Sequence, residues 1–258
     1  MKKSMIFLCL IAAGVAFADN TTTGANTYGV LRVDSSAAET IVAVPWVGAS
    51  SDGSASIQVA DIVKTANLNN GDELYAYIGG EFKAWILNDN TWTPQHIVNS
   101  DGPANTAGSA SQTLTRGQAI LLRRKAPIAN CFYVFGQVAS TSTAELTIAV
   151  GTPETPAYTL IAPPVDAEIA DLNTIIEYKS GTPLTGDIIF VAASSGKSGL
   201  MTDYHWNGTE WGKYQRATTM GGSETFVAGL SIPVGEGAWY VSKGGNPVIT
   251  WKNLPSAQ

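Results

Sequence analysis

Short apolar runs separated by polar turns follow one another along almost the whole chain. Runs such as Glu73–Ile78, Phe82–Leu87 and Ala119–Arg124 are rich in Val, Ile, Leu and aromatic residues, and Gly, Asn, Asp, Ser or Pro clusters bound them. Runs of this kind predict short β-strands. The other expected strands are Tyr28–Val33, Thr40–Trp46, Cys131–Val138, Glu145–Val150, Tyr158–Ala162, Asp187–Ala193, Leu200–Trp206, Glu210–Gln215, Phe226–Ile232, Ala238–Ser242 and Val248–Trp251.

The spacing of these runs predicts an all-β protein. Only Val59–Ala66 and Glu168–Thr174 carry a helical hint, and neither is long enough for more than a turn or two. Many short strands without long helices between them are typical of β-sandwiches and β-barrels.

The pattern also occurs twice. Landmarks recur in the same order in residues 27–143 and 144–258: Val44-Pro45 with Ala162-Pro163, Gly71-Asp72 with Gly186-Asp187, Asn88 and Trp92 with Asn207 and Trp211, and Gly117–Lys125 with Gly235–Lys243. The sequence therefore predicts two tandem homologous β-sandwich or β-barrel domains of about 115 residues each. Each is long enough to bury a core of its own.

Two β-hairpins are the clearest local predictions. Trp85–Trp92 indicates a strand, a polar turn and a second strand, and Tyr204–Trp211 repeats this order around Asn207-Gly208. Asn-Gly favours tight hairpin turns because both residues tolerate positive φ.

The N-terminal segment has the form of a secretory signal peptide over residues 1–18. Lys2 and Lys3 precede an apolar stretch that is too short to span a membrane, and Ala16-Phe17-Ala18 provides small residues before the expected cleavage site. A flexible polar lead-in follows at 19–26. We therefore expect an exported protein in the periplasm, at the cell surface or outside the cell, without a membrane span.

The charge of the chain limits its possible partners, and its cysteine content limits its disulfide bonds. Removal of the signal peptide takes two of the 15 basic residues and none of the 21 acidic ones, so the net charge becomes 13 − 21 = −8. An acidic chain without a basic patch argues against nucleic acid as a partner. Cys131 would be the one cysteine left, so no internal disulfide can form.

No set of residues predicts catalysis. The acids that recur are Asp61 with Asp171, at the start of the helical hints, and Asp72 with Asp187, at strand starts, and these positions suit structural roles. Gly196-Lys197-Ser198 lacks the earlier glycine and the following helix of a phosphate-binding loop. Two histidines and one cysteine make a zinc site improbable, and we expect no metal or cofactor. A weakly bound Ca²⁺ in an Asp-containing loop such as Asp89-Asn90-Thr91 stays open as an alternative.

Tryptophan provides the candidates for ligand binding. An indole face can stack on a sugar ring, so Trp46, Trp85, Trp206 and Trp239 are the candidate ligand-binding residues, while the alternative role for each is core packing.

Thr40–Trp46, the Gly-Asp strand starts and the two Asn-x-x-x-Trp hairpins resemble a group of secreted, internally duplicated β-rich bacterial proteins. The resemblance implies a fold and no activity. We expect a non-catalytic exported protein with a structural or adhesive role at the bacterial envelope or surface, which associates with itself or with a surface polysaccharide. The alternative is a carbohydrate-binding module, and the third hypothesis is a glycan-acting hydrolase.

Overall fold

The computed structural model of the protein describes residues 28–34, 38–44, 56–59, 68–98, 102–125, 131–137, 143–164, 169–192, 201–215, 223–233, 235–245, 247–252 and 254. The expected signal peptide and lead-in, Trp46, Asp61, nearly all of the helical hint Val59–Ala66 and the Gly196-Lys197-Ser198 loop lie outside these residues.

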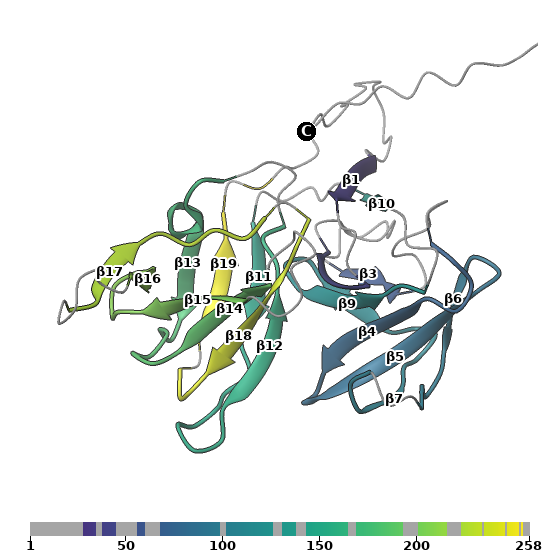
Figure 1. The fold of residues 1–258 in the computed structure, drawn as a ribbon, viewed down its shortest axis with the longest axis horizontal. Helices are drawn as coiled ribbons and strands as arrows, with labels where there is room; N and C mark the ends of the chain where they lie inside the picture. The colour runs from purple at the N-terminus through teal and green to yellow at the C-terminus, as the bar shows by residue number, and fades with distance from the viewer. Residues whose placement is uncertain are drawn as a thin grey trace, which may run out of the picture.

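The described chain is all-β, as the hydrophobic pattern predicts (Figure 1). The strands up to residue 137 are β1 (Tyr28–Asp34), β2 (Glu39–Ala43), β3 (Ser56–Gln58), β4 (Glu73–Ile78), β5 (Glu81–Asn88), β6 (Thr91–Pro94), β7 (Asn105–Ala107), β8 (Thr113–Thr115), β9 (Ala119–Arg123) and β10 (Cys131–Gln137). The later ones are β11 (Ala144–Thr147), β12 (Ala157–Ile161), β13 (Ile176–Ser180), β14 (Ile188–Ala192), β15 (Met201–Trp206), β16 (Trp211–Gln215), β17 (Thr225–Ala228), β18 (Ala238–Ser242) and β19 (Val248–Trp251). The helical hint Glu168–Thr174 contains a single 3₁₀ turn, η2 (Leu172–Thr174).

Each half of the chain has one large sheet, and the order of strands in the two sheets corresponds. The order is β2-β9-β4-β5-β6 in the first half, with β7 added beside β5, and β12-β18-β14-β15-β16-β17 in the second. Among the described residues no sheet closes into a barrel, so the barrel alternative is wrong: every sheet ends in edge strands.

The large sheet of the second half covers a core together with a smaller sheet, β11-β19-β13 (Figure 1). Residues from both sheets meet in this core, among them Tyr240 and Trp211 from the large sheet and Ile249 and Trp251 from the small one. In the first half, β3 and β8 supply Ile57 and Leu114 to the core under the large sheet.

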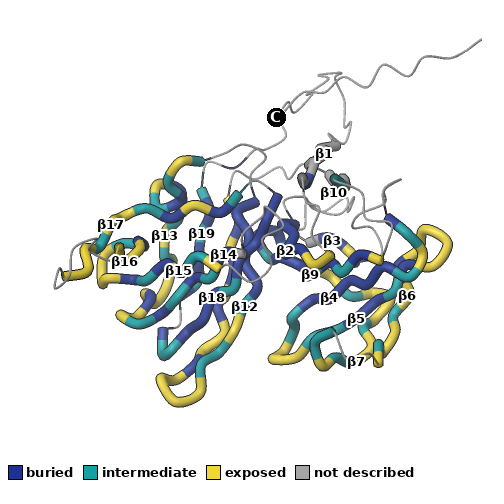
Figure 2. Tube along the Cα trace, in the orientation of Figure 1, coloured by how far each residue is buried: buried dark blue, intermediate teal, exposed yellow. Residues whose placement is uncertain are grey.

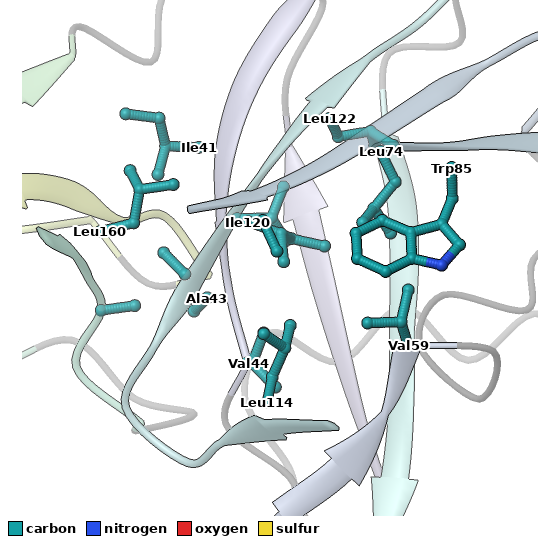
Figure 3. Packing of buried hydrophobic residues seen from close by; sticks show 14 of the residues in the cluster. Ile41, Ala43, Val44, Val59, Leu74, Trp85, Leu114, Ile120, Leu122 and Leu160 are labelled. Carbon is teal, nitrogen blue, oxygen red and sulfur yellow. The ribbon is translucent and has the colours of Figure 1, made fainter. Parts of the chain in front are cut away.

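The core of the first half also takes residues from the second. Figure 3 shows Ile41, Ala43 and Leu160 close together beside the core formed by Ile120, Leu74 and Trp85. Because Leu160 belongs to β12, the halves share buried surface. Figure 2 shows the same region, where β2 and β12 approach each other, as continuously buried.

Backbone contacts between the halves are reciprocal. The Ala43 N–H donates to the Gly235 carbonyl at 2.9 Å, and the Ala162 N–H donates to the Gly117 carbonyl at 2.9 Å. Two isolated bridges follow the same relation, Val42 with Glu236 and Gln118 with Ile161. A contact that is repeated with the roles exchanged is the mark of a two-fold arrangement.

Strand pairing corrects one detail of the sequence alignment. Val42 pairs with Ile120, and Ile161 pairs with Ala238. Since Gly117–Lys125 aligns with Gly235–Lys243, Ala43 corresponds to Ala162. The predicted match of Val44-Pro45 with Ala162-Pro163 differs from this register by one residue, because it follows the proline that the two dipeptides share.

Candidate functional site

The structure buries two of the four candidate tryptophans. Trp85 is 1% exposed and its indole Nε1–H donates to the Ser109 carbonyl at 3.2 Å, while Trp206 is 7% exposed. A Cβ on Gly108 would lie 2.1 Å from the Trp85 ring, so the loop after β7 closes directly over this indole. Trp46 lies outside the described residues, which leaves Trp239 as the candidate with a partly exposed ring.

Trp239 is the centre of an aromatic cluster at the contact between the halves. Its ring lies edge-to-face with Tyr77, Phe82 and Tyr158, at centroid distances of 5.6, 5.7 and 6.1 Å. Tyr77 and Phe82 come from β4 and β5 of the first half, and Tyr158 comes from β12. Tyr158 is 45% exposed. We name these four residues the junction cluster.

A second aromatic group lies on β15, β16 and β17, and we name His205, Tyr214 and Phe226 the aromatic strip. Ring centroids are 5.3 Å apart between His205 and Tyr214 and 5.4 Å apart between Tyr214 and Phe226. Tyr214 is 50% exposed. The strip therefore presents Tyr214 to solvent, flanked by the half-buried His205 and Phe226.

Strand alternation places the strip on the face of the sheet that is opposite the core. Trp206 and Trp211 are cross-strand neighbours and both are buried in the core. Because successive side chains point to opposite faces, His205 and Tyr214 point away from the core. Gly212 makes the strip continuous, since a Cβ there would lie 2.5 Å from the Phe226 ring, which occupies that space.

A polar pair lies at one end of the strip. His205 Nε2 and Asp203 Oδ2 are 2.9 Å apart, and the Asp203 side chain is 59% exposed. The hydrogen bond with His205 lowers the pKa of the Asp203 carboxyl. Ring faces beside a carboxylate and an imidazole can stack on an apolar ring surface while bonding to its hydroxyl groups, a combination that suits carbohydrate.

Corresponding positions on the two outer faces carry opposite chemistry. In the first half, Glu73 Oε2 accepts from Arg123 Nη1 at 2.9 Å and from Tyr75 Oη at 2.7 Å, and its Oε1 lies 2.7 Å from Lys125 Nζ. Arg123 Nε also donates to Glu39 at 2.6 Å. The Glu73 side chain is 3% exposed, so this is a largely buried ionic network.

Apolar residues replace that network in the second half. Glu73 pairs with Arg123 across β4 and β9, and the equivalent cross-strand pair of β14 and β18 is Ile188 with Val241. Phe190 stands at the place of Tyr75, and Tyr158 pairs with Val241 as Glu39 pairs with Arg123. At these corresponding positions the outer face is therefore charged in the first half and apolar or aromatic in the second.

The recurring strand-start aspartates hold backbone turns. Asp72 is fully buried and accepts from the Asn69 and Lys125 N–H groups at 2.8 and 2.6 Å. Asp187 is also fully buried, and it accepts from the Leu184 and Lys243 N–H groups at 3.1 and 2.7 Å and from the Tyr240 hydroxyl at 2.9 Å. These contacts account for both carboxylates.

Asp171 has a similar structural role, because it caps η2. Its Oδ1 accepts from the Asn173 N–H at 3.0 Å and from the Leu230 N–H at 3.0 Å. The second contact ties the turn to the chain segment after β17. Among the described residues no three of the side chains of His, Cys, Asp and Glu gather as a metal site would require.

Sequence reasoning missed the aromatic strip. It selected tryptophan as the binding residue, whereas the strip consists of the exposed Tyr214 and the half-buried His205 and Phe226. The pattern Asp203-Tyr204-His205-Trp206 contains the signal, because alternation puts His205 on the face opposite the two large aromatic residues. Comparison with protein-family models, curated proteins and solved structures finds no match to this chain. In the described part of the chain no helix is both long and apolar enough to cross a membrane.

Proposed function

We propose that this is a non-catalytic, exported protein with an adhesive role at the bacterial surface. The observation that carries the proposal is the aromatic strip, where Tyr214 contacts the rings of both His205 and Phe226 on the sheet face opposite the core. The Tyr214 ring is 50% exposed, and side chains of this size on an open sheet face mark an interaction surface. The acids described above have structural partners or lie at the strip, which supports binding in place of catalysis.

Surface polysaccharide is the target that the strip favours, and carbohydrate binding is thus the second candidate function. The specific observation in its favour is the Asp203–His205 pair beside Tyr214. A planar ring surface would contact the apolar face of a sugar, and the carboxylate would accept hydrogen bonds from its hydroxyl groups. A strip three rings long suits several sugar units in a row better than one.

We also infer that the two halves are homologous domains of sandwich type. Support comes from the corresponding strand orders, from Asp72 and Asp187 in the same turn contacts, and from the reciprocal bonds between the halves. On this view the first half keeps a charged outer face and the second half carries the binding surface, so duplication allowed one face to change.

The test is binding of purified protein, without residues 1–18, to a panel of soluble polysaccharides by affinity electrophoresis and calorimetry. Tyr214→Ala should weaken binding about tenfold, because loss of a stacked ring costs on the order of 1.4 kcal/mol. Tyr158→Ala is the matched control, since Tyr158 is an exposed tyrosine in the junction cluster.

Unchanged binding by Tyr214→Ala would contradict a role for the strip. If Tyr158→Ala loses binding while Tyr214→Ala keeps it, the junction cluster with Trp239 is the binding surface instead. Absence of binding to every polysaccharide of the panel, and to intact bacterial cell walls, would contradict the adhesive role.

A further inference from the structure

The two large sheets have four outer edges, and three of them are occupied or blunted. Edge strands β2 and β12 lie at the contact between the halves, where Val42 and Ile161 form bridges to the opposite half. The edge beyond β5 is formed by β6, which contains Pro94 without an N–H to offer another strand, and by the three-residue strand β7, which also pairs with β5. The fourth edge is β17, at the end of the sheet farthest from the first half (Figure 1).

β17 carries none of the charges, prolines or bulges that normally protect an edge. Its sequence is Thr225-Phe226-Val227-Ala228, without charge or proline, and β16 is its one strand partner among the described residues. Val227 is 41% exposed. Native proteins blunt open edges with charges, proline or bulges, and an edge left apolar and regular is able to accept another strand.

The register shows which backbone groups face the open side. The Gly229 N–H donates to the Trp211 carbonyl at 2.9 Å, in line with the ladder that pairs Val227 with Lys213. Along an antiparallel strand, the N–H and C=O groups of one residue point to the neighbouring strand on one side, and those of the next residue point to the other side. Thr225 and Val227 therefore direct their backbone groups to β16, while Phe226 and Ala228 direct theirs outward.

We propose that β17 pairs with β17 of a second copy of this chain, antiparallel and centred on Val227. In this register Phe226 of one copy lies opposite Ala228 of the other, and each such pair exchanges both of its N–H···O bonds. All outward groups of β17 are then used. A large ring meets a small side chain, and the two Val227 side chains meet in the close, non-hydrogen-bonded pair.

This pairing joins the large sheet of the second half in one copy to the same sheet in the other copy. The corresponding faces of the two sheets lie on the same side, because Val227 of one copy pairs with Val227 of the other. The aromatic strips of the two copies then lie side by side on the same face. Two strips on one rigid surface would bind a long polysaccharide with higher avidity than one. Self-association itself is measured without any ligand, so it stands or falls separately from the adhesive role.

The pairing segment is short, so the dimer should be weak and dependent on concentration. Sedimentation velocity of the wild-type protein, in a dilution series that reaches high micromolar concentration, should show a reversible monomer–dimer equilibrium. Val227→Glu should weaken the dimer at least about tenfold, because two carboxylates meet at the centre of the pair. Within one copy the new carboxylate faces Lys213, which favours the folded monomer.

Ala228→Pro removes an outward N–H that has no bond to another described residue of the same copy, and it should weaken the dimer in the same way. Val98→Glu is the matched control, since Val98 is 85% exposed and lies in the first half, and it should dimerise like the wild type. An equimolar mixture of Val227→Glu and Val227→Lys should form a heterodimer, an outcome that a folding defect cannot produce.

A wild-type protein that stays monomeric over the whole series would overturn the proposal. Dimerisation of Val227→Glu and Ala228→Pro at the wild-type affinity would overturn it equally. Sugar binding in either case would still be decided by Tyr214→Ala, so the two proposals fail independently.

Discussion

The contrast between the two outer faces predicts that the ionic network around Glu73 can be replaced but not broken. Glu73→Ile introduces the residue of the second half at one position and removes the partner of Arg123 and of the Tyr75 hydroxyl. The triple substitution Glu73→Ile, Tyr75→Phe and Arg123→Val installs the three apolar residues that the second half has as Ile188, Phe190 and Val241, and leaves Glu39 in place.

The expected changes in unfolding free energy follow from the burial of the charged groups. The Arg123 side chain is 14% exposed, so it stays largely desolvated after Glu73 is removed, and it keeps Glu39 as a charged partner. Breaking a buried ion pair on one side costs about 3–5 kcal/mol, and this residual partner places the single variant near the lower end, at about 3 kcal/mol. A well-packed apolar replacement is neutral or stabilising, so the triple variant should lie within about 1 kcal/mol of the wild type.

Urea unfolding followed by tryptophan fluorescence measures both variants. The urea concentration at the unfolding midpoint should fall clearly for Glu73→Ile and return to the wild-type value for the triple variant. The dependence of the unfolding free energy on urea concentration should stay unchanged. Glu145→Gln is the control, because Glu145 and Lys179 form an exposed pair whose loss should cost less than about 1 kcal/mol. A triple variant as unstable as the single one would refute the reasoning, as would a single variant with wild-type stability.

Three further predictions concern acid stability and packing. Burial raises the pKa of Glu73, but hydrogen bonds from Lys125 and Tyr75 and the nearby positive charges outweigh it and leave the pKa lowered. The stability that depends on this carboxylate is thus present above its unfolded pKa of about 4.3 and is lost as pH falls through the pKa of the folded state. The difference in unfolding free energy between wild type and Glu73→Gln should therefore shrink in acid. A difference that stays constant with pH would contradict the role given to the Glu73 carboxylate. Gly108→Ala should lower the unfolding free energy by about 1–3 kcal/mol, because its Cβ would lie 2.1 Å from the Trp85 ring, and an unchanged urea midpoint would show that the loop does not close over the indole. Asp187→Asn places an amide group among three donors and should cost about 1–3 kcal/mol in the same assay, whereas wild-type stability would mean that these bonds are dispensable.

Local features of the fold were predictable wherever a residue type determines the backbone. Gly71 and Gly186 before the strand-start aspartates have φ of +91° and +108°, a conformation that glycine adopts without strain. The polar turn of the first hairpin places Asp89 and Asn90 at φ of +47° and +62°, as a tight hairpin turn requires. The strands β3, β7 and β8 escaped prediction because three residues give too little alternation, and the five-residue strand β13 was missed as well.

Burial of the tryptophans was not predictable from the chain. Trp85 and Trp206 stand in strands that look as amphipathic as their neighbours, yet each lies under another element: the loop at Gly108 over Trp85, and the smaller sheet over Trp206. His205 and Tyr214 of the strip belong to the same strands, β15 and β16, as the buried Trp206 and Trp211. Alternation separates the two faces of a strand, but it cannot say which face another sheet will cover.

The sequence by itself determined the fold class, most strands and the turns, because strand propensity and turn chemistry act over a few neighbouring residues. Only the tertiary structure decided which faces are covered, because the covering elements lie far away along the chain. It is the packing of distant segments that buries Trp85, joins the halves through Ala43 and Ala162, and leaves Tyr214 exposed on an open sheet. The candidate site is a consequence of what the second half leaves uncovered.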